Sequence, residues 1–214
     1  MTLRIAVPDG ALRAPSLQLL AAVGVTGGDL GAAVSVEPGL DTAIAVLAPD
    51  DVPSYLASGA ADAGLVAKDV LRERSAGLCE LLDLRFGGAL LIHAAAPGAA
   101  VRAQRLGRLR IATRHPTLTR SYFAARGVEV AVVEVVGALD HAVAAGLADG
   151  VVALVEAAPG SALQVGVAGL AVEGIVAESS VRLVAGRGAR VLHTAELGTL
   201  VARLRDLTAT RETA

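Results

Sequence analysis

The side chains best suited to chemistry in this sequence stand directly after short apolar runs. Lys68 is the sole lysine of the chain, and it follows the run 63–66 with Asp69 beside it. Arg114 and His115 follow a second apolar run in the same way. A cation in such a loop can hold a phosphate, and a histidine can transfer a proton. Lys68, Arg114 and His115 are therefore the candidate catalytic residues.

Each of these residues also has an ordinary structural interpretation. Lys68 could be a surface lysine at a helix start, paired with Asp69, and Arg114 could be a solvated loop arginine. Among the other histidines, His93 lies in an apolar run and is expected in the core, whereas His141 and His193 are expected at the surface. No spacing of His, Asp or Glu indicates a metal site with dedicated protein ligands.

The composition limits the class of protein. Hydrophobic residues make up 54% of the 214 residues but aromatic residues only 2%, so the core must consist of Ala, Val and Leu. A net charge of −2 argues against a nucleic-acid partner, and the single Cys79 excludes an intrachain disulfide. We see no signal peptide and no apolar run long enough to span a membrane. The expected location is therefore the cytoplasm.

Alternating strands and helices set the position of the candidate residues. The first part of the chain reads strand, helix, strand, helix, strand, helix, over residues 3–7, 15–23, 43–47, 50–58, 63–66 and 68–74. A strand at 90–94 follows, and Pro97-Gly98 marks a break after which the pattern restarts. This alternation predicts parallel sheets covered by helices.

The second part of the chain repeats this organisation. We predict strands at 110–113, 128–135, 150–155 and 181–185, helices at 117–125, 138–147 and 195–207, and a frayed tail at 208–214. The fold class is α/β with two lobes and mixed or parallel sheets: lobe I has residues 1–92 plus 180–214, and lobe II has residues 93–179. Ligands of open α/β sheets bind outside the carboxyl ends of strands and between lobes. The loops to consider are 8–12, 48–53, 67–69, 113–117 and 156–163.

These loops carry a family resemblance that runs from about residue 3 to residue 185. Its most specific part is Gly59-Ala-Ala-Asp-Ala-Gly-Leu-Val-Ala-Lys-Asp-Val-Leu. The segments 4–12, 15–20, 51–56, 80–87, 110–116, 120–123, 137–140 and 146–152 extend it in the same order. The sequence resembles the ATP phosphoribosyltransferases, which catalyse the first step of histidine biosynthesis, and it stops where the short form of that family stops.

The resemblance implies a fold, a reaction and partners. The fold is a pair of lobes similar to periplasmic binding proteins of type II. The reaction joins N1 of ATP to the ribose of phosphoribosyl pyrophosphate (PRPP) and releases pyrophosphate, with Mg²⁺ carried by the substrate phosphates. Short forms are regulated by a histidyl-tRNA-synthetase-like subunit, so a homodimer or a larger hetero-oligomer is expected.

The resemblance also implies which residues bind the substrates. Two polyanions need cations for their phosphates, a loop of backbone N–H groups for the 5′-phosphate, and carboxylates for ribose hydroxyls or Mg²⁺. The positions that correspond to such groups are Asp9, Gly10, Asp62, Lys68, Asp69, Thr113, Asp149, Glu156, Gly160 and Ser161.

Several positions depart from the family pattern. The first loop of the family reads Pro-Lys-Gly-Arg-Leu, whereas this chain has Asp9 and Ala11 in place of the two cations. In the PRPP loop, the second aspartate of the family is Ala153, and Ala157-Ala158-Pro159 replaces its Thr-Gly pair. A carboxylate at position 9 repels a phosphate, and Pro159 offers no N–H.

The departures leave three functions open. The chain could be an ATP phosphoribosyltransferase. It could be a catalytically impaired paralogue that serves as a non-catalytic subunit or binds a small ligand. It could also be a related enzyme with a changed substrate, because a two-lobed α/β fold supports many chemistries.

Overall fold

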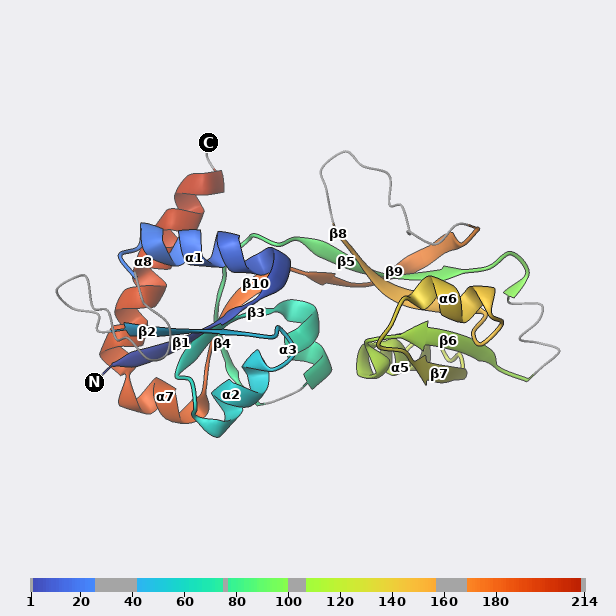
Figure 1. Ribbon diagram of the computed structural model, residues 1–214, viewed down its shortest axis with the longest axis horizontal. Coiled ribbons are helices and arrows are strands. Elements are labelled where there is room, and N and C mark those ends of the chain that lie inside the picture. The colour runs from blue at the N-terminus through green and yellow to red at the C-terminus, as the bar shows by residue number, and fades with distance from the viewer. Residues whose placement is uncertain (1, 26–41, 75–76, 100–106, 157–168, 213–214) are drawn as a thin grey trace. The chain divides into compact units, whose positions relative to one another are not determined.

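The computed structural model describes residues 2–25, 42–74, 77–99, 107–156 and 169–212. The chain divides into two compact units (Figure 1): unit 1 comprises Met1–Gly87 and Ser180–Ala214, and unit 2 comprises Gly88–Ser179. The lobe boundary predicted after residue 92 lies inside strand β5 (Ala89–Ala95), so the structure divides the chain earlier.

Unit 1 is built on a five-stranded sheet with the order β2-β1-β3-β10-β4. These strands are β1 (Leu3–Pro8), β2 (Thr42–Leu47), β3 (Ala63–Ala67), β4 (Cys79–Asp83) and β10 (Val181–Ala185). β1 pairs in parallel with β2 and β3, and β10 pairs antiparallel with both β3 and β4. The sheet is therefore mixed, and its second-last strand comes from the far end of the chain.

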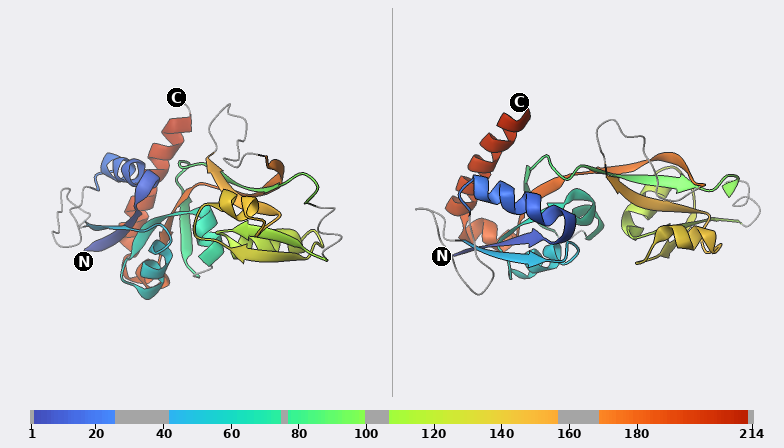
Figure 2. Two further views of the ribbon diagram at one scale, coloured as in Figure 1. Left: turned by 45° about the vertical axis from the view of Figure 1, so that its right-hand side comes forward. Right: turned by 45° about the horizontal axis from the view of Figure 1, so that its top comes forward.

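Helices cover both faces of this sheet, as Figures 1 and 2 show for unit 1. Alternate strand residues point to opposite faces. One face, with Ile5 of β1, packs against α1 (Arg13–Ala22) and α8 (Thr194–Glu212). The other face, with Ala6, packs against α2 (Val52–Ser58) and α3 (Lys68–Arg74). A short helix α7 (Arg187–Leu192) precedes α8, and a 3₁₀ turn, Gly10–Leu12, precedes α1.

Unit 2 repeats this arrangement. Its sheet has the order β7-β6-β8-β5-β9, from β6 (Leu109–Thr113), β7 (Val130–Glu134), β8 (Gly150–Glu156), β5 and β9 (Ala171–Ser179). β6 pairs in parallel with β7 and β8, and β5 pairs antiparallel with β8 and β9. Helix α5 (Pro116–Ala124) covers one face and α6 (Leu139–Ala144) covers the other. β6 and β8 thus occupy the places that β1 and β3 occupy in unit 1.

The structure confirms the two-lobed α/β fold and corrects some elements. Strands β4 and β9 and helix α7 were not predicted. The tail expected to fray from residue 208 is helical as far as Glu212, and Thr208 is buried. None of the helices in the described part of the chain is long and apolar enough to cross a membrane.

Candidate functional site

The carboxyl ends of the parallel strands in unit 1 gather several of the predicted side chains. Asp9 follows β1, Lys68 follows β3, and β4, which runs in the same direction, ends at Asp83. β10 runs the other way, so Ser180, which precedes it, lies at this same edge. Ligands of open α/β sheets bind at such an edge. This carboxyl edge is the candidate site of unit 1.

The loop after β1 is held by its backbone and balanced in charge. The N–H of Asp9 donates to the carbonyl of Leu47 over 2.7 Å. Gly10 follows with φ +77°, a left-handed conformation that glycine adopts at little cost. The exposed carboxylate of Asp9 lies 3.6 Å from Nη1 of Arg13, one turn further along. The loop therefore presents an anion and a cation side by side, and Arg13 was not predicted as part of the site.

Lys68 sits in a cluster of four charged side chains. Its Nζ forms an ion pair with Oε2 of Glu80 on β4. Oε1 of the same carboxylate accepts from Nη1 of Arg182, over 3.2 Å, and that nitrogen also lies 2.9 Å from Oδ2 of Asp83. Asp69, next to Lys68, is buried in the first turn of α3. Lys68 thus pairs with Glu80, while Asp69, the partner considered in the alternative interpretation, is buried.

Asp62 lies at the opposite edge of the sheet, where β3 begins. Its Oδ2 accepts from the backbone N–H and the Nε of Arg4, both over 2.9 Å, and its Oδ1 accepts from Nη2 over 2.8 Å. Nη2 also donates to the carbonyl of Gly59, and the N–H of Asp62 returns a bond to the carbonyl of Arg4. This bidentate pair fastens the start of β3 to β1.

The charges of this pair are stabilised by one another. Burial alone raises the pKa of the Asp62 carboxyl, but the hydrogen bonds and charge of Arg4 outweigh it and leave the pKa below its ordinary value. The hydrogen bond to Asp62 in turn raises the pKa of Arg4. Asp62 is therefore a charged, fully bonded group, with little capacity left to bind a ligand.

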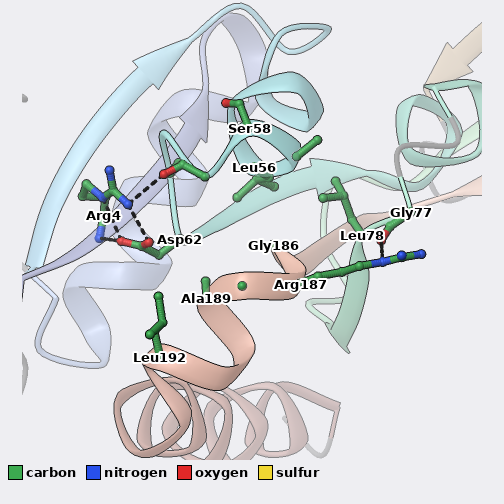
Figure 3. A pocket seen from close by; sticks show the side chains of 14 residues that line it. Arg4, Leu56, Ser58, Asp62, Gly77, Leu78, Gly186, Arg187, Ala189 and Leu192 are labelled. Carbon is green, nitrogen blue, oxygen red and sulfur yellow. Dashed lines mark hydrogen bonds and ion pairs between the residues drawn. The ribbon is translucent and has the colours of Figure 1, made fainter.

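A pocket of about 630 Å³ opens beside this pair, at the amino edge of unit 1 (Figure 3). Its lining includes Arg4, Leu56, Asp62 and Leu192. Arg187 reaches along one side and donates from Nε to the carbonyl of Gly77, over 2.7 Å. Of the predicted site residues that the structure describes, only Asp62 lines this pocket.

Asp149 repeats the arrangement of Asp62 in unit 2. Its Oδ2 accepts from the N–H and the Nε of Arg110, both over 3.1 Å, and its Oδ1 accepts from Nη2 over 2.9 Å. Nη1 of Arg110 donates to the carbonyl of Gly146. The hydrogen bond to Asp149 raises the pKa of Arg110. We call these two pairs, with the glycine three residues before each aspartate, the Arg–Asp clamps.

The carboxyl edge of unit 2 carries Thr113, Arg114, His115 and Glu156. The buried Thr113 hydroxyl donates to the carbonyl of Val152 and accepts from the N–H of His115, over 3.0 and 2.9 Å. Thr113 therefore holds the turn into α5. Arg114 is exposed and donates to the carbonyl of Gly137, while His115 is half-buried at the N-cap of α5. Glu156 is exposed at the end of β8.

The remaining predictions have mixed outcomes. Gly160, Ser161 and Ala157-Ala158-Pro159 lie outside the described residues. His93 is in the core as predicted, but the prediction that His193 lies at the surface is wrong. His193 is buried, with Nε2 3.9 Å from Asp62 and Nδ1 3.8 Å from Glu196. Its position at the junction of α7 and α8 turns it inward.

Sequence reasoning missed Glu80, Asp83 and Arg182 as members of the site. Glu80 and Asp83 lie within the segment 80–87 that matches the family, and Arg182 interrupts the apolar strand 181–185. An arginine within such a strand needs carboxylate partners, because burying an unpaired charge is costly. Arg182 within an apolar strand was therefore the feature of the sequence that could have indicated nearby carboxylates. Among the described residues, no group of three His, Cys, Asp or Glu side chains could hold a metal ion.

Comparison with known families identifies a relationship over most of the chain. Residues 48–206 match the family model HisG: ATP phosphoribosyltransferase. The ATP phosphoribosyltransferase of Symbiobacterium thermophilum is 36% identical over 98% of this chain and 96% of its own. That of Pseudomonas paraeruginosa is 34% identical over 95% of this chain and 96% of its own.

Solved structures show the same fold. The ATP phosphoribosyl transferase (HisG:HisZ) complex from Thermotoga maritima contains a chain that matches with a TM-score of 0.79 and 22% identity, covering 98% of this chain and all of its own. The periplasmic aliphatic sulphonate binding protein SsuA from Escherichia coli matches with a TM-score of 0.59 and 15% identity, covering 99% of this chain and 74% of its own. The similarity to periplasmic binding proteins confirms the predicted architecture.

Proposed function

The chain belongs to the ATP phosphoribosyltransferase family, and from this membership we propose that it transfers the phosphoribosyl group of PRPP to N1 of ATP and releases pyrophosphate. The observation that carries the proposal is the similarity to named members at 36% identity over 98% of the chain. Similarity of this extent includes both carboxyl edges and the elements that position them.

Two cations are the proposed contacts for the substrate phosphates. Lys68 in unit 1 is partly exposed at its carboxyl edge, and Arg114 in unit 2 is exposed at the corresponding edge. Charge-assisted hydrogen bonds to phosphate oxygens are about twice as strong as neutral ones. Thr113 supports Arg114 indirectly, because its hydroxyl fixes the turn that follows β6.

Mg²⁺ enters the proposal as a companion of the substrates. We propose that the ion arrives on the substrate phosphates, as the family resemblance implies. When bound there, Mg²⁺ neutralises charge on the phosphate oxygens. The protein's contribution is to orient the phosphates through Lys68 and Arg114.

Assembly and location complete the proposal. The relative from Thermotoga maritima forms a HisG:HisZ complex. We propose that this chain forms a homodimer or, with a regulatory subunit similar to histidyl-tRNA synthetase, a larger hetero-oligomer. We assign the assembly to the cytoplasm, where ATP and PRPP are available to it.

A non-catalytic paralogue is the second candidate, and a specific observation favours it. Asp9 places a carboxylate in a loop that carries a lysine in the family, and Arg13 is its ion-pair partner. Losing one charged contact to a reacting group commonly lowers the rate by about 100-fold. An enzyme with a changed substrate is the third candidate, and it would keep a different ligand at the same edges.

A coupled assay of pyrophosphate release separates these candidates. The chain is incubated with Mg²⁺, ATP and PRPP, with and without the partner subunit, and the phosphoribosyl-ATP product is quantified. Turnover with both substrates supports the proposed transfer. Absence of turnover with PRPP, even with the partner, identifies the non-catalytic paralogue, and release that needs PRPP but another acceptor identifies the changed substrate.

Restoring the family's cations should strengthen PRPP binding. Asp9 and Ala11 are both exposed, so Asp9→Lys with Ala11→Arg should not disturb the core. The double variant removes a repulsion and adds two charge-assisted contacts, so we expect about tenfold tighter binding of Mg²⁺–PRPP or more by calorimetry. The control Asp206→Lys changes the charge on α8 and should leave the affinity for PRPP unaltered. An equal gain in affinity in the control and in the double variant would show that only the net charge of the protein matters.

A further inference from the structure

The four-charge cluster around Lys68 contains two cations and two carboxylates that share partners. Glu80 contacts Lys68 with one oxygen and Arg182 with the other, and Arg182 also contacts Asp83. The side chains are partly exposed: 28% for Lys68, 31% for Glu80 and 20% for Arg182. Solvent reaches the cluster, so its ion pairs can exchange with a ligand.

The partners of Lys68 are anchored more firmly than Lys68 itself. Arg182 and Glu80 project from paired strands, and Asp83 is further fixed by the Ser180 hydroxyl over 3.0 Å and by the N–H of Arg85 over 2.9 Å. Lys68 has a flexible four-carbon stem, and among the described residues its ammonium group pairs with Glu80. Lys68 is therefore the member of the cluster most able to move.

The distribution of charge decides what happens when Lys68 moves. If Lys68 turns to an anionic ligand, Glu80 still has Arg182 as a partner 3.2 Å away. Without Arg182, the departure of Lys68 would leave the partly exposed carboxylate of Glu80 without a cation, and the loss of this ion pair would oppose the movement. Arg182 thus lowers the cost of releasing Lys68 while itself remaining bound to Asp83.

We propose that Glu80 holds Lys68 in the ligand-free protein and that Arg182 allows Glu80 to release Lys68 to an anionic substrate. The inference rests on the proposed function, since it takes PRPP as that substrate. Arg182 and Glu80 are positioning residues in this arrangement, because they act on the ligand through Lys68.

The sole lysine makes the cluster directly observable. Labelling lysine with ¹³C at Cε gives a single side-chain signal, from Lys68. The signal is followed in the wild type, Glu80→Gln, Arg182→Gln and the double variant, first without ligand and then during titration with Mg²⁺–PRPP. Calorimetry gives the dissociation constant, and thermal unfolding shows whether each variant is folded.

We expect that Glu80→Gln restores the PRPP affinity that Arg182→Gln lowers. Glu80→Gln shifts the lysine signal in the ligand-free protein. Arg182→Gln weakens PRPP binding by about three- to fivefold, the scale of one partly exposed ion pair. The double variant returns to within about 1.5-fold of the wild type, because the carboxylate that retained Lys68 is gone.

Other patterns overturn the inference. A double variant as weak as Arg182→Gln means that Arg182 contacts the ligand or only supports the fold. If Glu80→Gln does not shift the lysine signal, Glu80 does not hold Lys68 in the ligand-free protein. PRPP binding that leaves the wild-type lysine signal unchanged refutes this inference alone, whereas a wild type that binds no PRPP refutes the proposed function as well.

Discussion

His93 is an ionisable side chain placed in the apolar interior of unit 2. Its ring packs edge-on against Phe123 with 4.9 Å between centroids, and Tyr122 lies beyond. Its Nε2 has no hydrogen-bond partner among the described residues. Burial lowers the pKa of His93, the charge of Arg126 lowers it further, and Glu173 opposes both. His93 is therefore neutral in the folded protein at pH 7.

This burial makes the stability of unit 2 depend on pH. The unfolded histidine binds a proton below about pH 6.5, whereas the folded one resists it, so the unfolded state gains protons first as the pH falls. Stability should be complete above pH 6.5 and should decline below it, by at most about 1.4 kcal/mol per pH unit, until the folded pKa is reached.

Chemical denaturation between pH 7.5 and 5.5 measures this effect. The variant His93→Phe keeps a ring against Phe123 and removes the titration, so its stability should vary less across this range. Exposed His141 provides the matched control, because His141→Gln should keep the wild-type slope. Identical slopes in the wild type and His93→Phe would assign the pH dependence to other groups.

At this scale, the sequence predicted residue positions better than residue roles. Lys68, Arg114 and Thr113 lie at strand ends, as their place after apolar runs indicated. The bonding of Asp62 could not be predicted, because its partner Arg4 is 58 positions away and only the pairing of β1 with β3 joins them. The pairing of β6 with β8 conceals the partner of Asp149 in the same way. The roles assigned to the site residues remain predictions.

Each Arg–Asp clamp should stabilise the strand pairing of its own unit independently of the other clamp. Asp62→Asn and Asp149→Asn each remove a carboxylate that is 4% exposed and accepts three hydrogen bonds. Each change should cost about 1–3 kcal/mol. Hydrogen exchange should show faster opening in unit 1 for the first variant and in unit 2 for the second.

The losses of unfolding free energy caused by Asp62→Asn and Asp149→Asn should add in the double variant, because the two clamps lie in different units. Ligand affinity of the folded protein should change little, since the described bonding occupies both carboxylates. A loss of PRPP binding without a loss of stability would instead return Asp62 or Asp149 to the substrate-binding set.

Gly186, the residue before helix α7, packs closely against the backbone of Leu56. A Cβ built on Gly186 would lie 2.6 Å from the carbonyl oxygen of Leu56, whereas one on Gly188 would meet nothing within 4 Å. Gly186→Ala should therefore destabilise unit 1 by about 1–3 kcal/mol in urea unfolding. Gly188→Ala, in the same helix, should be neutral or stabilising by up to about 1 kcal/mol. Similar effects of both substitutions would mean that α7 adjusts freely.

The elements that the sequence predicted and those that it missed differ in their apolar pattern. β1, β2, β3, β6 and β8 were predicted because each contains a run of apolar residues. β4 and β9 stand at the edges of their sheets and carry charged residues, so their apolar pattern is broken. Helix α7 contains Gly188 and two arginines in six residues, too few for helical periodicity to be visible.

At the scale of the whole molecule, the two units differ in how the chain builds them. Unit 2 is one continuous segment, Gly88–Ser179, and its first and last strands, β5 and β9, pair with Ala89 opposite Ser179. Unit 1 needs both ends of the chain, since its core includes Leu183 from β10 and Leu200 and Leu204 from α8. The loss of the C-terminal helices should therefore affect the units unequally.

A chain that stops after Ala185 tests this difference. It keeps β10 but lacks α7 and α8, so one face of the sheet of unit 1 keeps α1 and loses the apolar side chains of α8. We expect NMR spectra in which the amides of unit 2 keep their native positions while those of unit 1 collapse to unfolded ones. Native signals from unit 1 would show that α8 is dispensable for its core.

The discontinuity of unit 1 also sets an order of events during protein synthesis. The ribosome releases β1 to β4 first, but β10, which separates β3 from β4 in the sheet, emerges only after all of unit 2. Until then the facing edges of β3 and β4 have no strand between them, a state prone to pairing with other chains. Unit 2 can thus fold before unit 1, although its synthesis begins later. Until β10 emerges, the nascent chain carries an incomplete sheet in unit 1.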